Sequence, residues 1–448
     1  MKCIDSLSGL RSLVVGVDIQ IPLINGKMVT AINFDNAATT PPLHSVMQEV
    51  MGFSPWYSSI HRGTGYKSQY SSFLYEKSRD TVLDFVKGDP HHHTVIYVKN
   101  TTEAINKLAN CLCFHKDKNV ILSTDLEHHS NDLPWRKKFV VDYIQMDNQG
   151  KLSLEDAEAK LKKHQGKVKL VTVTGASNVT GIKNPIHQLA ALAHRYDAKI
   201  MVDGAQLIPH APLDMKPFGS PEHIDYLAFS AHKMYAPFGI GVLIGPKTAF
   251  EENDPDHVGG GTVDLVTHDF VRWADPPAKE EAGSPNIIGV VALVKAMETL
   301  SSIEMYRIEN HEHQLTEYAM TRLCHIPDVQ LYVDCHDKNS RVSIIPFTIK
   351  GMPHDIVARI LSYEGGIAVR SGCFCAQPYV QKLLKIPPEE LKKRIEDPDT
   401  PHPGMVRISF GLYNTCHEID ILCQMLLTIV KNKKFYLQKY QMASPHFS

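Results

Sequence analysis

The chain has little net charge and no long apolar run. Its 47 basic and 49 acidic residues leave a formal net charge of −2, so no excess of one sign favours binding to nucleic acid or to an acidic membrane surface. No apolar stretch approaches the roughly 20 residues that a membrane-spanning helix needs. The N-terminus, Met1-Lys-Cys-Ile-Asp-Ser6, lacks the apolar core of a signal peptide. We therefore expect a cytoplasmic protein with no nucleic-acid or membrane partner.

A disulfide framework and internal repeats are also missing. The nine cysteines are an odd number without framework spacing in a chain of 448 residues, which indicates reduced thiols. No repeat or low-complexity tract interrupts the sequence. The length alone allows two to four domains.

Alternating strand and helix patterns fill the first two thirds of the chain. Between two apolar segments, Ile186, Leu189 and Ala193 recur at helical spacing behind Pro185. This alternation predicts an α/β domain with a mostly parallel sheet whose faces are covered. The expected strands are 95–98, 120–123, 170–174, 199–202, 226–229 and 241–244.

The pattern changes after a helical stretch at about 286–325. Strands are expected at 342–349, 367–370 and 405–409, with helices near 353–363 and from His417. We therefore predict an N-terminal segment (1–30), a large α/β domain (31–325) and a small C-terminal α+β domain (326–448). The Pro- and charge-rich piece 386–403 is interpreted as a surface excursion. The run His91–His93 is interpreted as a solvated loop rather than a metal site.

Lys233 lies where the expected strand 226–229 gives way to a loop. A lysine near a core is costly unless its amine is deprotonated or used covalently. Ser230 and His232 beside it could hold a phosphate, which is what a Schiff base to pyridoxal phosphate needs. The alternative is a surface lysine that follows a core strand.

Asp203 ends the expected strand 199–202. Pyridoxal chemistry needs a carboxylate that keeps the pyridine nitrogen protonated, and open α/β sheets bind ligands at the carboxyl ends of their strands. The alternative for Asp203 is a turn or helix N-cap residue. Asp203 and Lys233 together are a stronger indication of this cofactor than either residue alone.

Short motifs along most of the chain resemble one enzyme superfamily. They are Asn33–Thr40, His61–Gly63, Thr101–Asn106, Glu127–Asn131, Ser177-Asn178, Val202–Gln206, Ser230–Lys233, Gly283–Asn286, Arg370–Cys375 and Val406–Ser409. The chain resembles the class V aminotransferases among the fold-type I pyridoxal-phosphate enzymes, and within them the cysteine desulfurases and selenocysteine lyases.

The resemblance implies a homodimer with pyridoxal 5′-phosphate attached to Lys233. It implies Asp203 at the pyridine nitrogen, and Asn178 and Gln206 at the phenolic oxygen. The implied phosphate ligands are Thr101, Thr102, Ser230, His232 and, from the neighbouring subunit, Ser284. The family usually has threonine at this last position, and serine keeps the hydroxyl.

Two further positions match residues that handle the substrate. His128 matches the histidine that stacks on the cofactor ring and moves protons, with His129 as the competing assignment. Arg407 matches the arginine that binds the substrate α-carboxylate, for which bidentate pairing explains the choice of arginine, and Asn178 is implied beside it. The alternative for Arg407 is a salt-bridged arginine on a strand.

Cys375 decides the reaction. The Arg-x-Gly-x-x-Cys pattern that begins at Arg370 matches the desulfurase subgroup with a short cysteine loop. It implies that Cys375 attacks the sulfur of L-cysteine, keeps it as a persulfide and releases alanine. The alternatives are an inert buried cysteine or half of a metal site, which the Cys-x-Cys spacing disfavours, so we expect no metal.

Two departures from the subgroup concern the sulfur acceptor. Cys373 is a second thiol that could receive or resolve the persulfide, and the excursion 386–403 could cover the site or dock an acceptor protein. Three other hypotheses remain: a different class V enzyme (C–S lyase or aminotransferase), a selenocysteine lyase, or a non-catalytic sulfur-relay or scaffold protein.

Overall fold

A computed structural model describes residues 9–113, 117–147, 150–334, 340–397, 400 and 402–441. The chain divides into two compact units. The large unit comprises residues 42–176 and 183–306, and the small unit comprises residues 1–41, 177–182 and 307–448. This division differs from the expected boundaries, because residues 1–41 group with the C-terminal region. Residues 1–6, on which the expectation about the N-terminus rests, lie outside the described residues.

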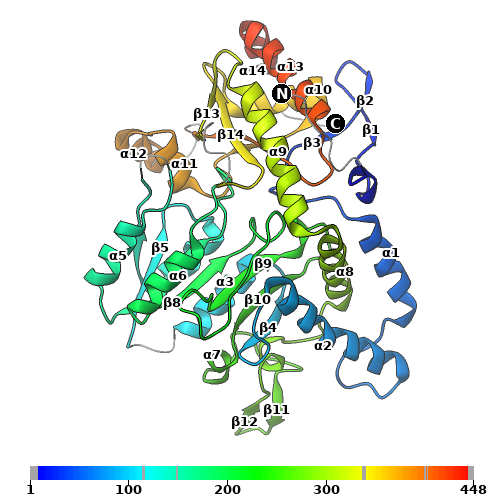
Figure 1. The fold of residues 1–448 in the computed structure, drawn as a ribbon, viewed down its shortest axis with the longest axis vertical. Coiled ribbons are helices and arrows are strands. Elements are labelled where there is room, and N and C mark those ends of the chain that lie inside the picture. The colour runs from blue at the N-terminus through cyan, green and yellow to red at the C-terminus, as the bar shows by residue number, and fades with distance from the viewer. Residues whose placement is uncertain are drawn as a thin grey trace. The chain divides into compact units, whose positions relative to one another are not determined.

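A seven-stranded sheet forms the centre of the large unit, in the order β4-β10-β9-β8-β7-β5-β6 (Figure 1). The pairs from β9 to β6 are parallel, whereas β10 runs antiparallel to β9 and to β4. The predicted α/β class and the six predicted strands are therefore confirmed. The strands are β4 (His93–Val98), β5 (Val120–Thr124), β6 (Val140–Ile144), β7 (Val168–Thr174), β8 (Lys199–Asp203), β9 (Tyr226–Ser230) and β10 (Gly241–Pro246).

Every residue of β4, β5, β9 and β10 is buried, as in strands whose two faces are both covered. Helix α3 (Thr101–Leu112) packs on β9 and β10, whereas α6 (Ile186–Arg195) packs on β7 and β8. The apolar stripe predicted for α6 is buried, and Pro185 is its N-cap residue. His93 is buried at the start of β4, so the interpretation of this residue as part of a solvated loop is wrong.

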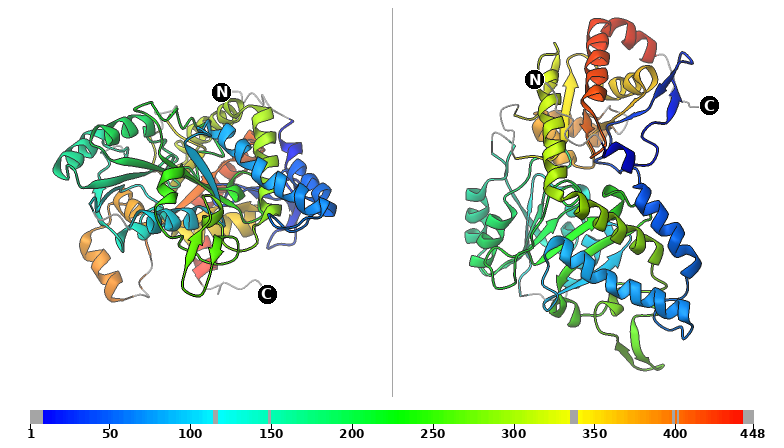
Figure 2. Two further views of the ribbon diagram at one scale, coloured as in Figure 1. Left: turned by 90° about the horizontal axis from the view of Figure 1, so that it is seen from below. Right: turned by 45° about the vertical axis from the view of Figure 1, so that its right-hand side comes forward.

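Three longer helices of the large unit pack together: α1 (His44–Phe53), α2 (Tyr66–Val86) and α8 (Ile287–Ile303). The antiparallel hairpin of β11 (Val263–Val266) and β12 (Val271–Trp273) extends away from the sheet (Figure 2). The remaining elements are η2 (Ser54–Trp56), η3 (His129–Asn131), α4 (Leu133–Arg136), α5 (Leu154–Lys163), η4 (Ala231–Lys233), α7 (Lys247–Glu251) and η5 (Ala278–Glu280).

The small unit is built on a four-stranded sheet in the order β13-β14-β17-β16. The predicted strands 342–349 and 405–409 and the two predicted helices are confirmed, whereas the expected strand 367–370 is two short strands in different sheets, β15 and β16. The excursion contains a helix without buried residues, α12. The elements are η1 (Arg11–Leu13), β1 (Gln20–Pro22), β2 (Met28–Thr30), β3 (Ile32–Asn33), α9 (Met305–Leu323), β13 (Val329–Leu331), β14 (Ile344–Ile349), α10 (His354–Gly365), β15 (Ile367–Ala368), β16 (Arg370–Gly372), α11 (Gln377–Leu383), α12 (Pro388–Glu396), β17 (Met405–Ser409), α13 (Cys416–Lys431) and α14 (Lys433–Gln441).

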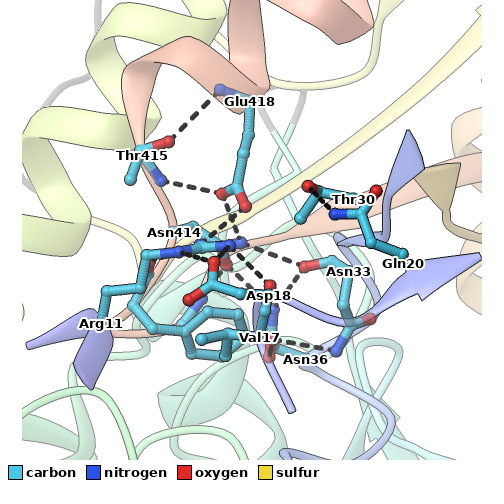
Figure 3. Close-up of polar contacts among 12 residues, drawn as sticks. Arg11, Val17, Asp18, Gln20, Thr30, Asn33, Asn36, Asn414, Thr415 and Glu418 are labelled. Atoms are coloured by element: carbon cyan, nitrogen blue, oxygen red, sulfur yellow. Dashed lines mark hydrogen bonds and ion pairs between the residues drawn. The ribbon is translucent and has the colours of Figure 1, made fainter. Parts of the chain in front are cut away.

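Polar contacts attach the N-terminal residues to the start of α13 (Figure 3). Arg11 donates to Glu418 Oε1 at 2.8 Å and to the Val17 carbonyl at 2.6 Å. Glu418 in turn accepts the backbone N–H of Thr415, the N-cap residue of α13, at 2.9 Å. These contacts explain why residues 1–41 belong to the small unit.

Cys416, at the start of α13, is disulfide-bonded. The prediction of reduced thiols is therefore wrong for this residue. The described cysteines that are free are Cys111, Cys113, Cys324, Cys373, Cys375 and Cys423. Among the described helices, none combines the length and the apolar character that crossing a membrane requires.

Candidate functional site

Hydroxyl groups gather at the amino end of α3 in the large unit. The Thr101 N–H donates to Ser230 Oγ at 2.8 Å, and the hydroxyl oxygens of these two residues are 2.6 Å apart. The Thr102 hydroxyl lies 2.7 Å from that of Ser130. Asn100 caps the helix by accepting the Glu103 N–H. Hydroxyls and amides at a helix amino end form a ready phosphate site.

Gly241 allows this arrangement to form. It pairs with Ser230 on one side and with Val98 on the other. A Cβ atom added to it would lie 2.6 Å from the Asn100 Cα, so a larger residue would push β10 and the start of α3 apart. The glycine therefore brings the end of β9 against the cap of α3.

Lys233 and His232 lie in η4, directly after β9. Both are partly buried. Burial, helped by the positive charge of Lys233, lowers the pKa of His232 to about 4. The His232 imidazole is therefore neutral near pH 7 and can donate one N–H to an anion.

Asp203 ends β8 next to the end of β9, because these two strands are parallel neighbours. Its buried carboxylate accepts the Ala205 N–H at 3.0 Å. Burial raises the pKa of Asp203, whereas the Ala205 N–H and the charge of Lys233 lower it. Gln206 is buried in the turn that follows. Asp203 and Lys233 thus lie at the sheet edge where open α/β sheets bind ligands.

His128 is tied to the hydroxyl cluster through Ser130. Its Nδ1 accepts the Ser130 N–H at 3.1 Å and lies 2.9 Å from the Ser130 hydroxyl. A backbone N–H can only donate, so the neutral His128 ring carries its proton on Nε2. His129 has a different environment. Burial lowers the pKa of its imidazole, against the charge of Asp132, and the charge of Arg136 lowers it further.

Glu127 is a residue whose role the sequence did not suggest, although it lies inside a matched motif. Its buried carboxylate accepts hydrogen bonds from the Thr124 hydroxyl (2.6 Å), the Asn131 amide (2.6 Å) and the Thr174 N–H (2.9 Å). Burial raises the pKa of Glu127 to about 8, against these three donors. Glu127 fixes the backbone directly before His128.

In the small unit, Arg407 lies on β17 and is 3% exposed. It donates to the Asn178 carbonyl at 2.7 Å and pairs with Asp35 at 3.3 Å. Its Nε is buried without a hydrogen-bond partner among the described residues. Burial lowers the pKa of Arg407 to about 10, against the charge of Asp35, so the guanidinium remains charged at neutral pH and its Nε–H is left to donate to a ligand.

The cysteine loop follows β16. Asn178 Nδ2 donates to the Phe374 carbonyl at 2.6 Å, and the Phe374 ring packs 4.9 Å from the Arg407 guanidinium. Phe374 and Cys375 have φ angles of 53° and 54°, a left-handed conformation that is strained for residues other than glycine. Cys375 is exposed. The loop thus presents this thiol on a strained but anchored backbone.

The two thiols of this loop differ. Cys373 donates to the Pro403 carbonyl at 2.9 Å, and burial raises the pKa of its thiol, against the charge of Arg394. A buried, protonated thiol is a poor nucleophile. Cys375 is the more accessible of the two.

The predicted residues fall into two sets, one in each unit. The large unit brings together Thr101, Thr102, His128, Asp203, Ser230, His232 and Lys233; the small unit brings together Asn178, Arg407 and Cys375. Ser284 is exposed behind Gly283 in the large unit and takes no part in the hydrogen bonds described above. Asp35 and Ser130 were not predicted as site residues, although both lie inside matched motifs. Asp35 is identified by its contact with Arg407, and Ser130 by its contact with His128.

The residues of the large unit fit pyridoxal phosphate. The Thr102 N–H has no acceptor among the described residues, at a helix end that attracts anions. A buried carboxylate and a lysine lie at the adjoining strand ends. These are the three groups that the cofactor needs for its phosphate, its ring nitrogen and its aldehyde.

Comparisons with known proteins agree with this chemistry. The family model "Aminotransferase class-V" matches residues 32–422. A probable cysteine desulfurase of Halalkalibacterium halodurans is 33% identical, over 92% of this chain and 95% of the relative. The cysteine desulfurase of Haloferax volcanii is 32% identical, over 91% and 92%. A probable cysteine desulfurase of Mycolicibacterium paratuberculosis is 35% identical over 91% of this chain, but the chain spans only 56% of that relative.

Solved structures show the same fold. The apo cysteine desulfurase of Thermococcus onnurineus superposes with a TM-score of 0.80 at 32% identity, covering 93% of this chain and 98% of that one. The Escherichia coli cysteine desulfurase CsdA gives a TM-score of 0.75 at 28% identity, covering 90% and 95%. A family match over most of the sequence and a shared fold-type I architecture lead to one conclusion: the chain belongs to the class V aminotransferase family.

Proposed function

We propose that the protein is a pyridoxal-phosphate-dependent cysteine desulfurase that converts L-cysteine to L-alanine and keeps the sulfur as a persulfide on Cys375. The observation that carries this proposal is the exposed thiol of Cys375, on a loop that Asn178 anchors and whose Phe374 ring lies against Arg407. An exposed, free thiol is what a desulfurase needs as the group that accepts the sulfur. The relatives named cysteine desulfurase support the same reaction.

The large unit would hold the cofactor, which supplies an electron sink for the substrate carbanion. Lys233 would bind its aldehyde carbon and move the substrate α-proton, and Asp203 would keep its ring nitrogen protonated. Asn178 and Gln206 would contact its phenolic oxygen. Thr101, Thr102, Ser230 and His232 would bind its phosphate, and we assign ring stacking and proton transfer at the substrate sulfur to His128. His128 is preferred to His129 because Ser130 links it to Thr102.

The small unit would bind and attack the substrate. Arg407 would pair with the α-carboxylate through its Nε and a neighbouring N–H, as guanidinium–carboxylate pairs do. The Cys375 thiolate would attack the substrate sulfur while the carbon–sulfur bond breaks. The reaction balances without an oxidant, since L-cysteine and one thiol give L-alanine and one persulfide.

The proposal includes a homodimer in the cytoplasm. The exposed Ser284, behind the left-handed Gly283, would reach the phosphate bound by a second copy. The six free thiols among the described residues favour a reducing compartment, whereas the disulfide at Cys416 stands against one. The final acceptor would be a thiol-bearing protein that takes the outer sulfur of the persulfide.

The test is to incubate the purified enzyme with L-cysteine in the absence of reductant and to locate bound sulfur by mass spectrometry. We expect one added sulfur on Cys375 and an equal amount of alanine. Cys375→Ala should keep the visible absorption of the bound cofactor but lose sulfur transfer, whereas Cys373→Ala, the matched control, should still form the persulfide. Pyruvate as the product, or full desulfurase activity in Cys375→Ala, would overturn the proposal. Turnover of selenocysteine but not cysteine would indicate a selenocysteine lyase.

A further inference from the structure

A second group of chemically reactive side chains lies in the large unit, apart from the residues discussed so far. His194, His223 and Asp225 each place a potential ligand atom within 4.8 Å of the others. His194 is in the last turn of α6, and Asp225 directly precedes β9. The group therefore lies at the amino end of β9, whereas Ser230 lies at the carboxyl end of the same strand.

Both imidazoles are held with one nitrogen turned away from Asp225. His194 Nδ1 lies 2.7 Å from the Pro221 carbonyl, and His223 Nδ1 lies 2.6 Å from the Ser220 carbonyl. A carbonyl only accepts hydrogen bonds, so both Nδ1 atoms carry a proton. Nε2 is then the nitrogen on each ring that is available to bind an ion. Metal-bound histidines are usually oriented in this way, with the second nitrogen donating to a backbone carbonyl.

Both Nε2 atoms face the Asp225 carboxylate. His194 Nε2 is 2.8 Å from Oδ2, and His223 Nε2 is 3.3 Å from Oδ1. The longer contact lacks hydrogen-bond geometry, and His223 Nε2 is buried without a hydrogen-bond partner among the described residues. Asp225 Oδ1 is buried as well, and it forms an ion pair with Lys199. A separation of about 3.3 Å is what two ligands show when they bind one tetrahedral ion at about 2.0–2.1 Å.

The three side chains are packed closely around one small space. The two imidazole rings stack with their centroids 4.1 Å apart and 18° between their planes, and Lys199 Nζ is 3.0 Å from Asp225 Oδ1. With the proton on Nδ1, each neutral imidazole offers the lone pair of its Nε2. A divalent ion between the three groups would accept both lone pairs and one carboxylate oxygen.

We propose that His194, His223 and Asp225 bind a divalent transition-metal ion such as Zn²⁺, with water completing the coordination. Two imidazole nitrogens and one carboxylate oxygen suit Zn²⁺, Co²⁺ or Ni²⁺ better than Mg²⁺ or Ca²⁺. The Lys199 side chain is half exposed, so its ammonium group can turn into solvent when the ion binds. The ion joins the end of α6 to the segment that begins β9, and its role is structural.

The experiment uses the intact holoenzyme with its thiols alkylated, so that cysteine does not bind the added metal. The protein is dialysed against ZnCl₂, and bound zinc is measured by mass spectrometry of the metal. We expect one equivalent per chain. His194→Asn and His223→Asn should each weaken zinc binding at least about 100-fold, more than the loss of an outer partner of a metal ligand costs.

His187→Asn is the matched control, because His187 lies on the same helix and its Nδ1 contacts a backbone carbonyl, that of Glu222, at 3.0 Å. It should bind zinc like the wild type. Lys199→Gln should bind zinc more tightly, since it removes the competing ammonium group. In a His194→Asn protein that folds and is active before its thiols are alkylated, zinc should no longer raise the melting temperature as it does in the wild type.

Two results would overturn the proposal. One is an alkylated wild-type enzyme that retains no zinc after dialysis. The other is a His194→Asn enzyme that binds zinc with the affinity and stoichiometry of the wild type.

Discussion

At the residue scale, Arg407 carries its charge at a cost that its neighbours only partly offset. It is almost wholly buried, it is paired with Asp35 and the Asn178 carbonyl, and its Nε has no hydrogen-bond partner among the described residues. A buried donor without an acceptor costs free energy unless a ligand satisfies it. The proposed substrate carboxylate would do so.

Arg407→Lys should therefore raise the KM for L-cysteine by about 10- to 100-fold, the equivalent of one lost charge-assisted hydrogen bond. An ammonium group keeps the charge but not the paired N–H geometry. Steady-state kinetics measure the change. Arg370→Lys is the control, since Arg370 pairs with the same Asp35 at 3.0 Å but is exposed, and it should leave KM nearly unchanged. Equal effects of both substitutions would contradict the role given to Arg407.

His232 should make the cofactor-free protein sensitive to acid. Its pKa is about 4 in the folded state, against an ordinary value of 6.5. Between these pH values the unfolded chain binds the extra proton, so stability rises with pH from about 4 to 6.5 and is then constant. His232→Asn should flatten this rise in urea unfolding measured across that range. An unchanged pH profile would show that His232 titrates normally.

The positions of single residues at strand ends could be predicted from the local sequence. Lys233 and Asp203 follow apolar runs, and the carboxyl ends of neighbouring parallel strands meet at one sheet edge. The sequence could not show that Ser130 connects Thr102 to His128, because that link joins an exposed hydroxyl to a separate loop.

At the scale of elements, the phosphate site depends on how closely β10 approaches α3. Gly241 is the contact point, and its missing side chain is the reason that the two elements fit. The strands themselves could be predicted from their continuous apolar composition. The order β4-β10-β9 could not, since it pairs β10 with β4, a strand more than a hundred residues earlier in the chain.

Gly241→Ala should weaken cofactor binding by about 5- to 150-fold, corresponding to the 1–3 kcal/mol that an added methyl group costs in a packed region. The Asn100 backbone has to move, and the start of α3 moves with it. Titration of the apoprotein with pyridoxal phosphate measures the effect. Gly259→Ala, where no atom lies within 4 Å of the new Cβ, should bind the cofactor like the wild type, and equal affinity in both variants would argue against the contact.

At the scale of the whole molecule, three separate stretches of sequence make up the small unit. The sequence suggested a simple order of domains, because nothing local marks residues 1–41 as part of the C-terminal unit. Their attachment rests on contacts such as Arg11 with Glu418, which are separated by 407 positions. Such contacts are not visible in periodicity or composition.

Arg11→Ala should lower the free energy of unfolding by about 1–3 kcal/mol, because it leaves the buried Glu418 carboxylate without its charged partner. The Glu418 side chain is 7% exposed, whereas Asp18, the other partner of Arg11, is 75% exposed. Asp18→Ala should consequently change stability by no more than about 0.5 kcal/mol. Chemical denaturation of the two variants measures the difference, and equal losses would show that Glu418 does not depend on Arg11.

The small unit combines stretches of sequence from before and after most of the large unit, and this order affects how the protein folds during synthesis. Residues 9–41 leave the ribosome before the large unit, yet β3 can pair with β15 only after residues 367–368 have been translated, and Arg11 can bond to Glu418 only later still. The large unit is complete by residue 306. The nascent chain must therefore keep residues 9–41 unpaired while the large unit is synthesised, and a polypeptide that stops before residue 367 would leave this segment exposed to chaperones and proteases.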